Sequence, residues 1–219
     1  MSKTVHLHTP LSEEDVRNLE LDDVVYLSGE AYSMLYANHY TLILDLMEQG
    51  KEVPMNLKDG VIYNTGTIWR RGEEGNYDMR ALGATTSSKF NAQTPPFIAA
   101  TGIRAIIGKG GMDQATLNAM QEYGCVYLAI VGGCSAVYTP AAKLVDDYWP
   151  ELMPVDNQRL KFELHDFGPL FVAMDANGNS VYAECADNAA KNCPAIYHQL
   201  GIKTEPNEHI GFAESKRYL

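Results

Sequence analysis

The sequence predicts an α/β fold. Three times along the chain a short apolar run is followed by glycine and then by a helical pattern, an order typical of α/β domains. The chain has 219 residues with 46% apolar side chains, which is enough for one full hydrophobic core. Its 18 glycines and ten prolines are spread along the sequence rather than clustered. We therefore expect a single domain over residues 1–200 and a polar extension over residues 201–219.

The first half of the chain supplies two strands, two helices and a hairpin. Ser12 and the three acidic residues after it predict a short helix. Residues 24–27 predict a strand that ends at Gly29. Further elements follow: a helix over residues 31–49, a strand over residues 61–63, and a polar hairpin or flap over residues 67–78.

The second half continues the same alternation. Strands are expected at residues 103–107, 125–131, 162–164 and 170–174, and helices at residues 113–123 and 135–144. Pro140 interrupts the second of these helices. The residues Asp-Ala-Asn-Gly at 175–178 have the chemistry of a hairpin turn.

Charge and hydropathy exclude two classes of function. The chain carries 17 Lys and Arg against 28 Asp and Glu, for a net charge of −11, which repels nucleic acid and anionic membrane surfaces. The first residues contain no apolar signal segment, and no stretch reaches the roughly 18 apolar residues that span a bilayer. We expect a cytoplasmic protein.

The four cysteines form no C-x-x-C pair, the spacing common in zinc and cluster sites. They are Cys125, Cys134, Cys185 and Cys193. We expect ordinary thiols and no metal site on this chain. Cys134 follows Gly132 and Gly133 directly and is the one thiol at a predicted ligand turn.

The first of three glycine-bounded turns is rich in hydroxyl groups. After Gly83 come Thr85, Thr86, Ser87, Ser88 and then Lys89. The hydroxyls offer donors and acceptors within one loop, and the ammonium of Lys89 suits a carboxylate. Alternatively, the run caps a helix near Phe90.

The other two turns combine glycines with one charged side chain or with a helix start. Lys109 lies between Gly108 and Gly110, where the backbone can approach a ligand closely. The segment lacks the P-loop pattern, and a lysine on a tight turn is the alternative. At Gly132 and Gly133 a helix N-terminus would face an anion.

His39 lies in the predicted helix over residues 31–49, near Tyr36 and Tyr40. Its ordinary pKa suits proton transfer. A hydrogen-bonding histidine at the edge of the core is the alternative.

Five segments together resemble the β subunit of L-tartrate dehydratase and the C-terminal domain of class I fumarase. They are residues 23–29, 83–88, 107–112, 131–133 and 166–179. They follow the family's order from about residue 20 to residue 184, which covers most of the chain.

The resemblance implies a swivelling β/β/α domain that acts with an α subunit. In that family the α subunit carries a [4Fe-4S] cluster on three cysteines of its own, and the β part binds carboxylates and helps to move a proton. The reaction is the reversible removal of water from a hydroxy dicarboxylic acid. This chain would contribute no cluster ligand, and the assembly would be α2β2 or contain a homodimer of β.

Position by position, the resemblance assigns roles to particular residues. Thr85 would take part in proton abstraction, Thr86 would contact the substrate, and Lys109 would bind a carboxylate. His39 falls where the family has a histidine. The remaining predicted substrate-binding residues are Ser87, Ser88, Lys89, Gly108, Gly132 and Gly133.

The departures from the family pattern concern its carboxylate clamps. Leu35 and Lys89 stand where the family has arginines, Tyr36 replaces an aspartate, and Ala84 replaces a proline. A charged hydrogen bond contributes about 1.5 to 3 kcal/mol, and lysine cannot reproduce the arginine fork. The resemblance then predicts a hydroxy acid with a different or less charged far end. Four other arginines are candidates to compensate, namely Arg70, Arg71, Arg80 and Arg104.

Three functional hypotheses stay open at this point. The first is the catalytic half-site of an α/β heteromeric lyase. The second is a subunit that has lost catalysis and serves as a partner or carboxylate-binding chain. The third is a separate binding protein for phosphate or carboxylate, which rests on Lys109 and its glycines alone.

Overall fold

The computed structural model describes residues 2–73, 76–148 and 159–202. The chain divides into two compact units, Met1–Ser180 and a second unit that begins at Val181. The described part of the second unit is mainly the helix α5, Val181–Leu200. The predicted single domain over residues 1–200 stays a prediction.

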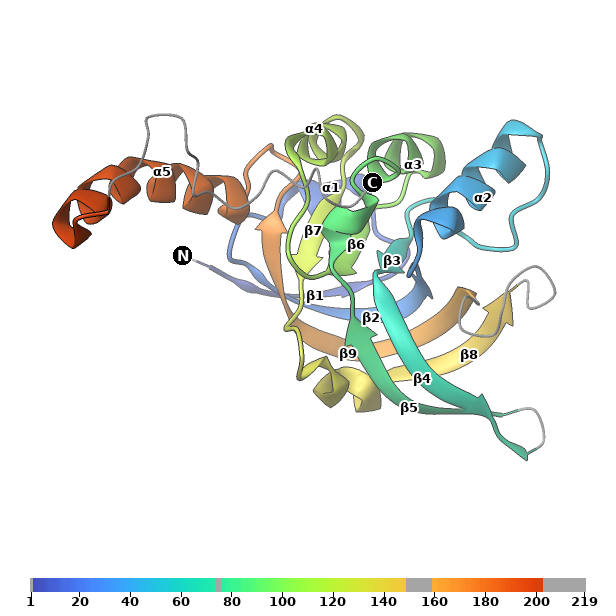
Figure 1. Cartoon of the computed structure of the whole chain (residues 1–219). Coiled ribbons are helices and arrows are strands. Elements are labelled where there is room, and N and C mark those ends of the chain that lie inside the picture. The colour runs from blue at the N-terminus through green and yellow to red at the C-terminus, as the bar shows by residue number, and fades with distance from the viewer. Residues whose placement is uncertain (1, 74–75, 149–158, 203–219) are drawn as a thin grey trace. The chain divides into compact units, whose positions relative to one another are not determined.

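Parallel strands form the centre of the first unit (Figure 1). They are β1 (Thr4–His8), β2 (Val24–Ser33), β3 (Val61–Tyr63), β6 (Ala105–Gly108) and β7 (Val126–Ala129). Each successive pair in this order is parallel. Every residue of β3 and β6 is buried, as expected for apolar strands covered on both faces. The predicted α/β fold is therefore confirmed as a mixed sheet with helices.

A long antiparallel strand closes four of these strands, all but β1, into a ring. Strand β9 (Arg159–Met174) pairs with β7, with β2 and with the edge strand β8 (Ala142–Tyr148). The pairings β2–β3, β3–β6, β6–β7, β7–β9 and β9–β2 return to their starting strand. Side chains from these five strands share one buried cluster that includes Val25, Tyr63, Ile107, Leu128 and Phe162.

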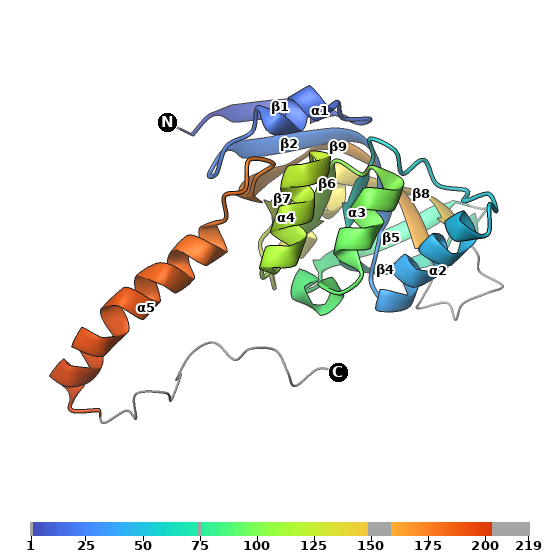
Figure 2. The same cartoon turned by 90° about the horizontal axis from the view of Figure 1, so that it is seen from above.

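Three helices lie side by side on one face of the parallel strands (Figures 1 and 2). They are α2 (Ala37–Glu48), α3 (Thr94–Thr101) and α4 (Gln114–Tyr123). The short helix α1 (Glu13–Arg17) follows β1 and begins with the predicted cap, because the Ser12 hydroxyl accepts from the Asp15 N–H group. The first unit is thus layered, with helices, parallel strands and antiparallel strands in turn.

The predicted hairpin is present as a separate two-stranded sheet. Strand β4 (Thr65–Arg71) pairs with β5 (Tyr77–Ala84). Two 3-10 helices accompany it, η2 (Ser87–Phe90) directly after β5 and η3 (Ser135–Ala141) before β8. Hydrogen bonds fasten the hairpin to η3, because Ser135 Oγ lies 3.2 Å from both Ala84 N and Leu82 O.

The structure corrects three predicted elements. Strand β2 continues past Gly29 to Ser33, so the following helix begins at Ala37 instead of residue 31. The helix expected over residues 135–144 ends at Ala141, where β8 begins. The two closing strands are one strand, β9, whose register against β2 shifts at two irregular positions.

None of the helices in the described part of the chain is long and apolar enough to span a bilayer.

Candidate active site

The carboxyl ends of the parallel strands meet at one edge of the sheet. Strand β2 leads to Leu35, β3 to Asn64, β6 to Lys109 and β7 to Gly132. Three backbone hydrogen bonds connect these ends: Met34 N to Tyr63 O at 2.8 Å, Asn64 N to Ile107 O at 2.8 Å, and Ile130 N to Gly108 O at 2.9 Å. Ligands of α/β folds gather at this edge.

The hairpin delivers Thr85 and Thr86 to the same edge. The N–H group of Thr85 donates to the carbonyl of Asn64 at 2.8 Å. Thr86 forms a parallel bridge with Lys109, and the N–H group of Ser87 donates to the Lys109 carbonyl at 2.9 Å. Two of the three predicted turns therefore lie against each other.

The third turn joins them through Gly132. A Cβ atom built on Gly132 would lie 3.7 Å from Cδ and 4.0 Å from Nζ of Lys109. These are ordinary van der Waals distances, so Gly132 lies directly beside the lysine side chain. We call Thr85, Thr86, Lys109 and Gly132 the threonine–lysine cluster. The side chains of its threonines and lysine are half-buried, which suits contact with a small ligand.

Ser87 and Gly108 lie behind this cluster in the buried interior. Ser87 is fully buried, and its Oγ accepts from the hydroxyl of Tyr127 at 3.0 Å. A Cβ atom on Gly108 would lie 2.0 Å from that Oγ. Only glycine leaves room for the Ser87 hydroxyl at position 108. Ser87 and Gly108, both predicted to bind substrate, therefore pack in the interior behind the hydroxyl turn.

Asn64 is a site residue that sequence reasoning missed. It is fully buried at the end of β3, and its side-chain N–H groups donate to the Met34 carbonyl at 3.1 Å and to Tyr40 Oη at 2.7 Å. Its Oδ1 has no hydrogen-bond partner among the described residues. A buried polar group without a partner costs about 1 to 3 kcal/mol. The sequence feature that could have identified Asn64 was its place as a polar residue directly after a short apolar strand.

His39 is fully buried in the first turn of α2. Its Nδ1 accepts from the N–H group of Leu35 at 3.4 Å, and its ring packs edge-on against Tyr36. Leu35 lies beside Gly66, because a Cβ atom built on Gly66 would be 3.6 Å from Cδ1 of Leu35. His39 therefore holds the end of β2 through its hydrogen bond to Leu35. Leu35 in turn lies near the start of strand β4.

Three predicted residues lie outward from the threonine–lysine cluster. Ser88 and Lys89 are exposed on η2, and Gly133 has no atom within 4 Å of its Cβ position. The four arginines that were candidates to compensate for Leu35 and Lys89 are each paired with a carboxylate elsewhere: Arg70 and Arg80 with Asp78, Arg71 with Asp147, and Arg104 with Asp59.

The cysteines do not form a cluster site. Across the described ranges, no three His, Cys, Asp or Glu side chains are arranged to hold a metal ion. Cys125 is buried, and burial raises the pKa of its thiol to about 12, so it is protonated at neutral pH. Cys134 is exposed at the start of η3. The donor set of the described residues therefore does not fit a [4Fe-4S] cluster.

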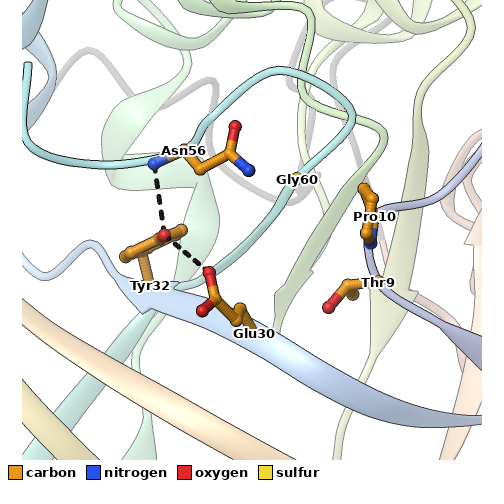
Figure 3. Close-up of a pocket in the computed structure, with 6 residues that line it drawn as sticks. All are labelled: Thr9, Pro10, Glu30, Tyr32, Asn56 and Gly60. Atoms are coloured by element: carbon orange, nitrogen blue, oxygen red, sulfur yellow. Dashed lines mark hydrogen bonds between the residues drawn. The ribbon is translucent and has the colours of Figure 1, made fainter.

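A pocket of about 310 Å³ lies away from this edge, where β1 ends beside β2 (Figure 3). It is lined by Thr9, Pro10, Glu30, Tyr32, Asn56 and Gly60. The Tyr32 hydroxyl donates to Glu30 at 3.1 Å, and the same carboxylate pairs with Lys161. Thr9 Oγ1 has no hydrogen-bond partner among the described residues, and the pocket shares no residue with the threonine–lysine cluster.

Hydroxyls, glycines and one ammonium at the carboxyl ends of parallel strands are a combination typical of sites for small anionic molecules in α/β domains. The comparison with known families is specific. Residues 1–185 match the model of the Fumarase C-terminus family, so the chain belongs to that family.

Similar curated proteins carry related names. A putative L(+)-tartrate dehydratase subunit beta of Methanocaldococcus jannaschii is 36% identical over 175 residues, 80% of this chain and 89% of the relative. The L(+)-tartrate dehydratase subunit beta of Escherichia coli K12 is 29% identical, over 81% of this chain and 86% of its own. A putative fumarate hydratase class I of Geobacillus stearothermophilus is 31% identical over 83% of this chain and 34% of its own length.

Proposed function

We propose that this chain is the β subunit of a heteromeric hydro-lyase that reversibly removes water from a hydroxy acid. The observation that carries the proposal is the bridge between Thr86 and Lys109, which sets the hydroxyl turn against the only cation of the cluster. Membership of the Fumarase C-terminus family and the names of the similar proteins support it.

Each residue of the cluster has a chemical role in this proposal. The ammonium of Lys109 binds a substrate carboxylate, and Gly132 lies beside the lysine side chain. The Thr85 hydroxyl takes part in moving the proton from the carbon next to that carboxylate, and Thr86 contacts the substrate beside it. Loss of this proton and of hydroxide from the neighbouring carbon forms the double bond and one water molecule.

The cofactor belongs to the partner in this proposal. The described donors of this chain do not fit a [4Fe-4S] cluster, so an α subunit would carry it and supply Lewis-acid chemistry. This chain would be a swivelling β/β/α domain in an α2β2 or similar assembly in the cytoplasm. Its own contribution is to bind and orient the acid and to handle the proton.

We further propose that the substrate is less charged at its far end than malate or tartrate. Leu35 is apolar, Lys89 is exposed, and the four other arginines considered are paired with carboxylates. Lys109 is then the only strong carboxylate anchor that the described cluster offers. An uncharged far end would avoid leaving a carboxylate without a partner.

The decisive experiment is anaerobic co-purification of this chain with its candidate α subunit, followed by the ultraviolet absorbance of the unsaturated product for a panel of hydroxy acids. We expect turnover only with both chains, and its loss in Thr85→Ala and Lys109→Ala. Lys143→Ala, which changes an exposed lysine on β8, serves as the control. Turnover that survives both cluster substitutions would refute the proposed roles.

The substrate proposal has its own test in Leu35→Arg and Lys89→Arg. We expect one or both substitutions to raise activity on malate, because a guanidinium can bind a carboxylate with two hydrogen bonds. A wild-type complex that is already fast on malate or tartrate would remove the proposal.

A second candidate is a partner subunit without catalysis, favoured by Leu35 and the exposed Lys89 at the places of the family's clamps. It predicts a stable complex with an intact cluster and no turnover on any hydroxy acid. Retention of both threonines and Lys109 at one edge favours the lyase instead.

A further inference from the structure

We infer that Asn64 is a positioning residue, which holds the turn with Thr85 and Thr86 in register with Lys109. The inference takes its catalytic meaning from the proposed function, but its geometric part concerns this chain alone. Asn64 is not among the residues that the sequence or the family resemblance singled out.

The contacts of Asn64 reach four separate segments of the site. Its side chain binds the end of β2 at Met34 and helix α2 at Tyr40. Its backbone binds β6 at Ile107 and the hydroxyl turn at Thr85. One fully buried residue therefore links the strand that leads to Leu35, the strand that leads to Lys109, and the turn that carries both threonines.

The orientation of the Asn64 side chain follows from its partners. The Met34 carbonyl can only accept a hydrogen bond, so the atom facing it is the amide nitrogen. Burial raises the pKa of Tyr40 well above its ordinary value, so its hydroxyl stays neutral beside the amide. The amide oxygen consequently faces the end of β6, 3.3 Å from the position of a Cβ on Gly108.

A buried amide suits this position better than an apolar side chain for one physical reason. Strand ends carry backbone groups that no longer have ladder partners, and a fixed amide can satisfy one of them directly. An apolar side chain would leave the Met34 carbonyl and the Tyr40 hydroxyl without this donor. The strand end and the hydroxyl turn attached to it would then move more freely.

The first test measures backbone hydrogen exchange in the isolated chain for wild type and Asn64→Ala. We expect the Thr85 amide to exchange about tenfold faster, the change expected when two ordinary hydrogen bonds are lost. The amide of Val172 on β9, which donates to the carbonyl of Asp23 before β2, should keep its rate. Asn118→Ala, an exposed asparagine on α4, is the matched control.

Tyr40→Phe is a second variant that keeps the packing and removes only the hydroxyl. We expect a smaller increase in exchange at the same amide. An unchanged Thr85 rate in both variants would overturn the inference, as would equal acceleration of Thr85 and Val172, which reports general destabilisation.

The second test uses the complex with the α subunit and the hydroxy acid that it turns over. A positioning role predicts that Asn64→Ala lowers kcat by about tenfold to a hundredfold, with a smaller change in KM. An unchanged kcat would refute positioning for catalysis. If wild type shows no turnover, the proposed function fails, while the exchange of Thr85 still decides whether Asn64 holds the turn.

Discussion

At the scale of single residues, Gly108 sets how closely the hydroxyl turn approaches the end of β6. Gly108 and Gly132 both lie against side chains from other turns, whereas Gly133 borders open space. Glycine content alone does not distinguish these positions, because all three follow predicted strands. The difference depends on which side chain arrives from elsewhere in the chain.

Gly108→Ala should therefore destabilise the protein. The new Cβ would lie 2.0 Å from Ser87 Oγ, which Tyr127 holds in place. Overpacking of this kind costs about 1 to 3 kcal/mol. Chemical denaturation measures the change.

Gly133→Ala is the matched control, since no atom lies within 4 Å of its Cβ position. Its effect should stay within about 0.5 kcal/mol, as for ordinary surface substitutions. Equal effects at positions 108 and 133 would contradict the packing argument.

Sequence reasoning identified the threonines, Lys109 and the glycine turns, and the structure brings Thr85, Thr86, Lys109 and Gly132 together. It missed Asn64, because a buried asparagine has meaning only through partners that lie 24 and 30 residues away in the chain. It also grouped Ser87 with the ligand-facing hydroxyls. Ser87 faces the interior, where its hydroxyl accepts a hydrogen bond from Tyr127. Because these residues are far apart in the chain, local sequence does not indicate this contact.

At the scale of elements, one carboxylate fastens the end of the β4–β5 hairpin at Arg71 and Tyr77 to β8. Asp147 on β8 accepts from Tyr77 Oη at 2.6 Å and from Arg71 Nη2 at 2.8 Å. Burial alone would raise the pKa of Asp147, but these two donors outweigh it and hold that pKa below its ordinary value. The hairpin that delivers Thr85 is thus fastened to the long sheet.

Asp147→Ala should loosen the hairpin and lower the free energy of unfolding by about 1 to 3 kcal/mol, because two hydrogen bonds to a charged group are lost. Arg70→Ala, which removes an exposed ion pair in the same hairpin, should change it by less than about 1 kcal/mol. Denaturation of both variants gives the comparison. A larger loss in Arg70→Ala would contradict the assigned role of Asp147.

Helix α4 offers a second test at this scale. Asp113 caps it by accepting from Thr116 N at 2.9 Å and from Thr116 Oγ1 at 2.8 Å. Asp113→Ala should cost about 1 kcal/mol in unfolding free energy. Asn118→Ala on the exposed face of the same helix should be nearly silent, and similar losses in the two variants would rule out a capping role.

The elements that were predicted well are those whose limits are set locally. The Ser12 cap, the helix over residues 113–123 and the hairpin over residues 67–78 belong to this group. The predicted strand ended at Gly29 because a glycine after an apolar run indicates a turn. In the structure, pairing with β9 continues past Gly29 and β2 extends to Ser33. Strand β9 was divided in two because its bends lie within one strand paired to three partners. Tertiary pairing overrode local signals in both cases.

At the scale of the whole molecule, buried carboxylates should set the response to acid. Burial alone would raise the pKa of Asp23, but the N–H groups of Glu20 and Lys3 donate to it and the pKa is lowered overall. The pKa of Asp147 is lowered as well. A carboxylate with a lower pKa in the folded state stabilises it above the unfolded pKa, and that contribution is lost as pH falls through the folded value.

The free energy of unfolding should therefore be level near neutral pH and fall below about pH 4, the region where unfolded aspartates bind protons. Asp23→Asn and Asp147→Asn should each flatten this fall and lower stability at neutral pH. Denaturation at a series of pH values measures both effects. A fall that is equally steep in both variants and in wild type would show that other groups dominate.

The ring of strands also constrains how the protein can be made. Strand β2 has its antiparallel partner in β9, so Val24 pairs with Phe171 across most of the chain. A ribosome releases the N-terminal strands long before that partner, and pairings between such distant residues are slow to form. Until residue 174 has left the exit tunnel, the growing chain carries apolar strands with an open edge. The first unit should accordingly complete its folding only after β9 has been synthesised.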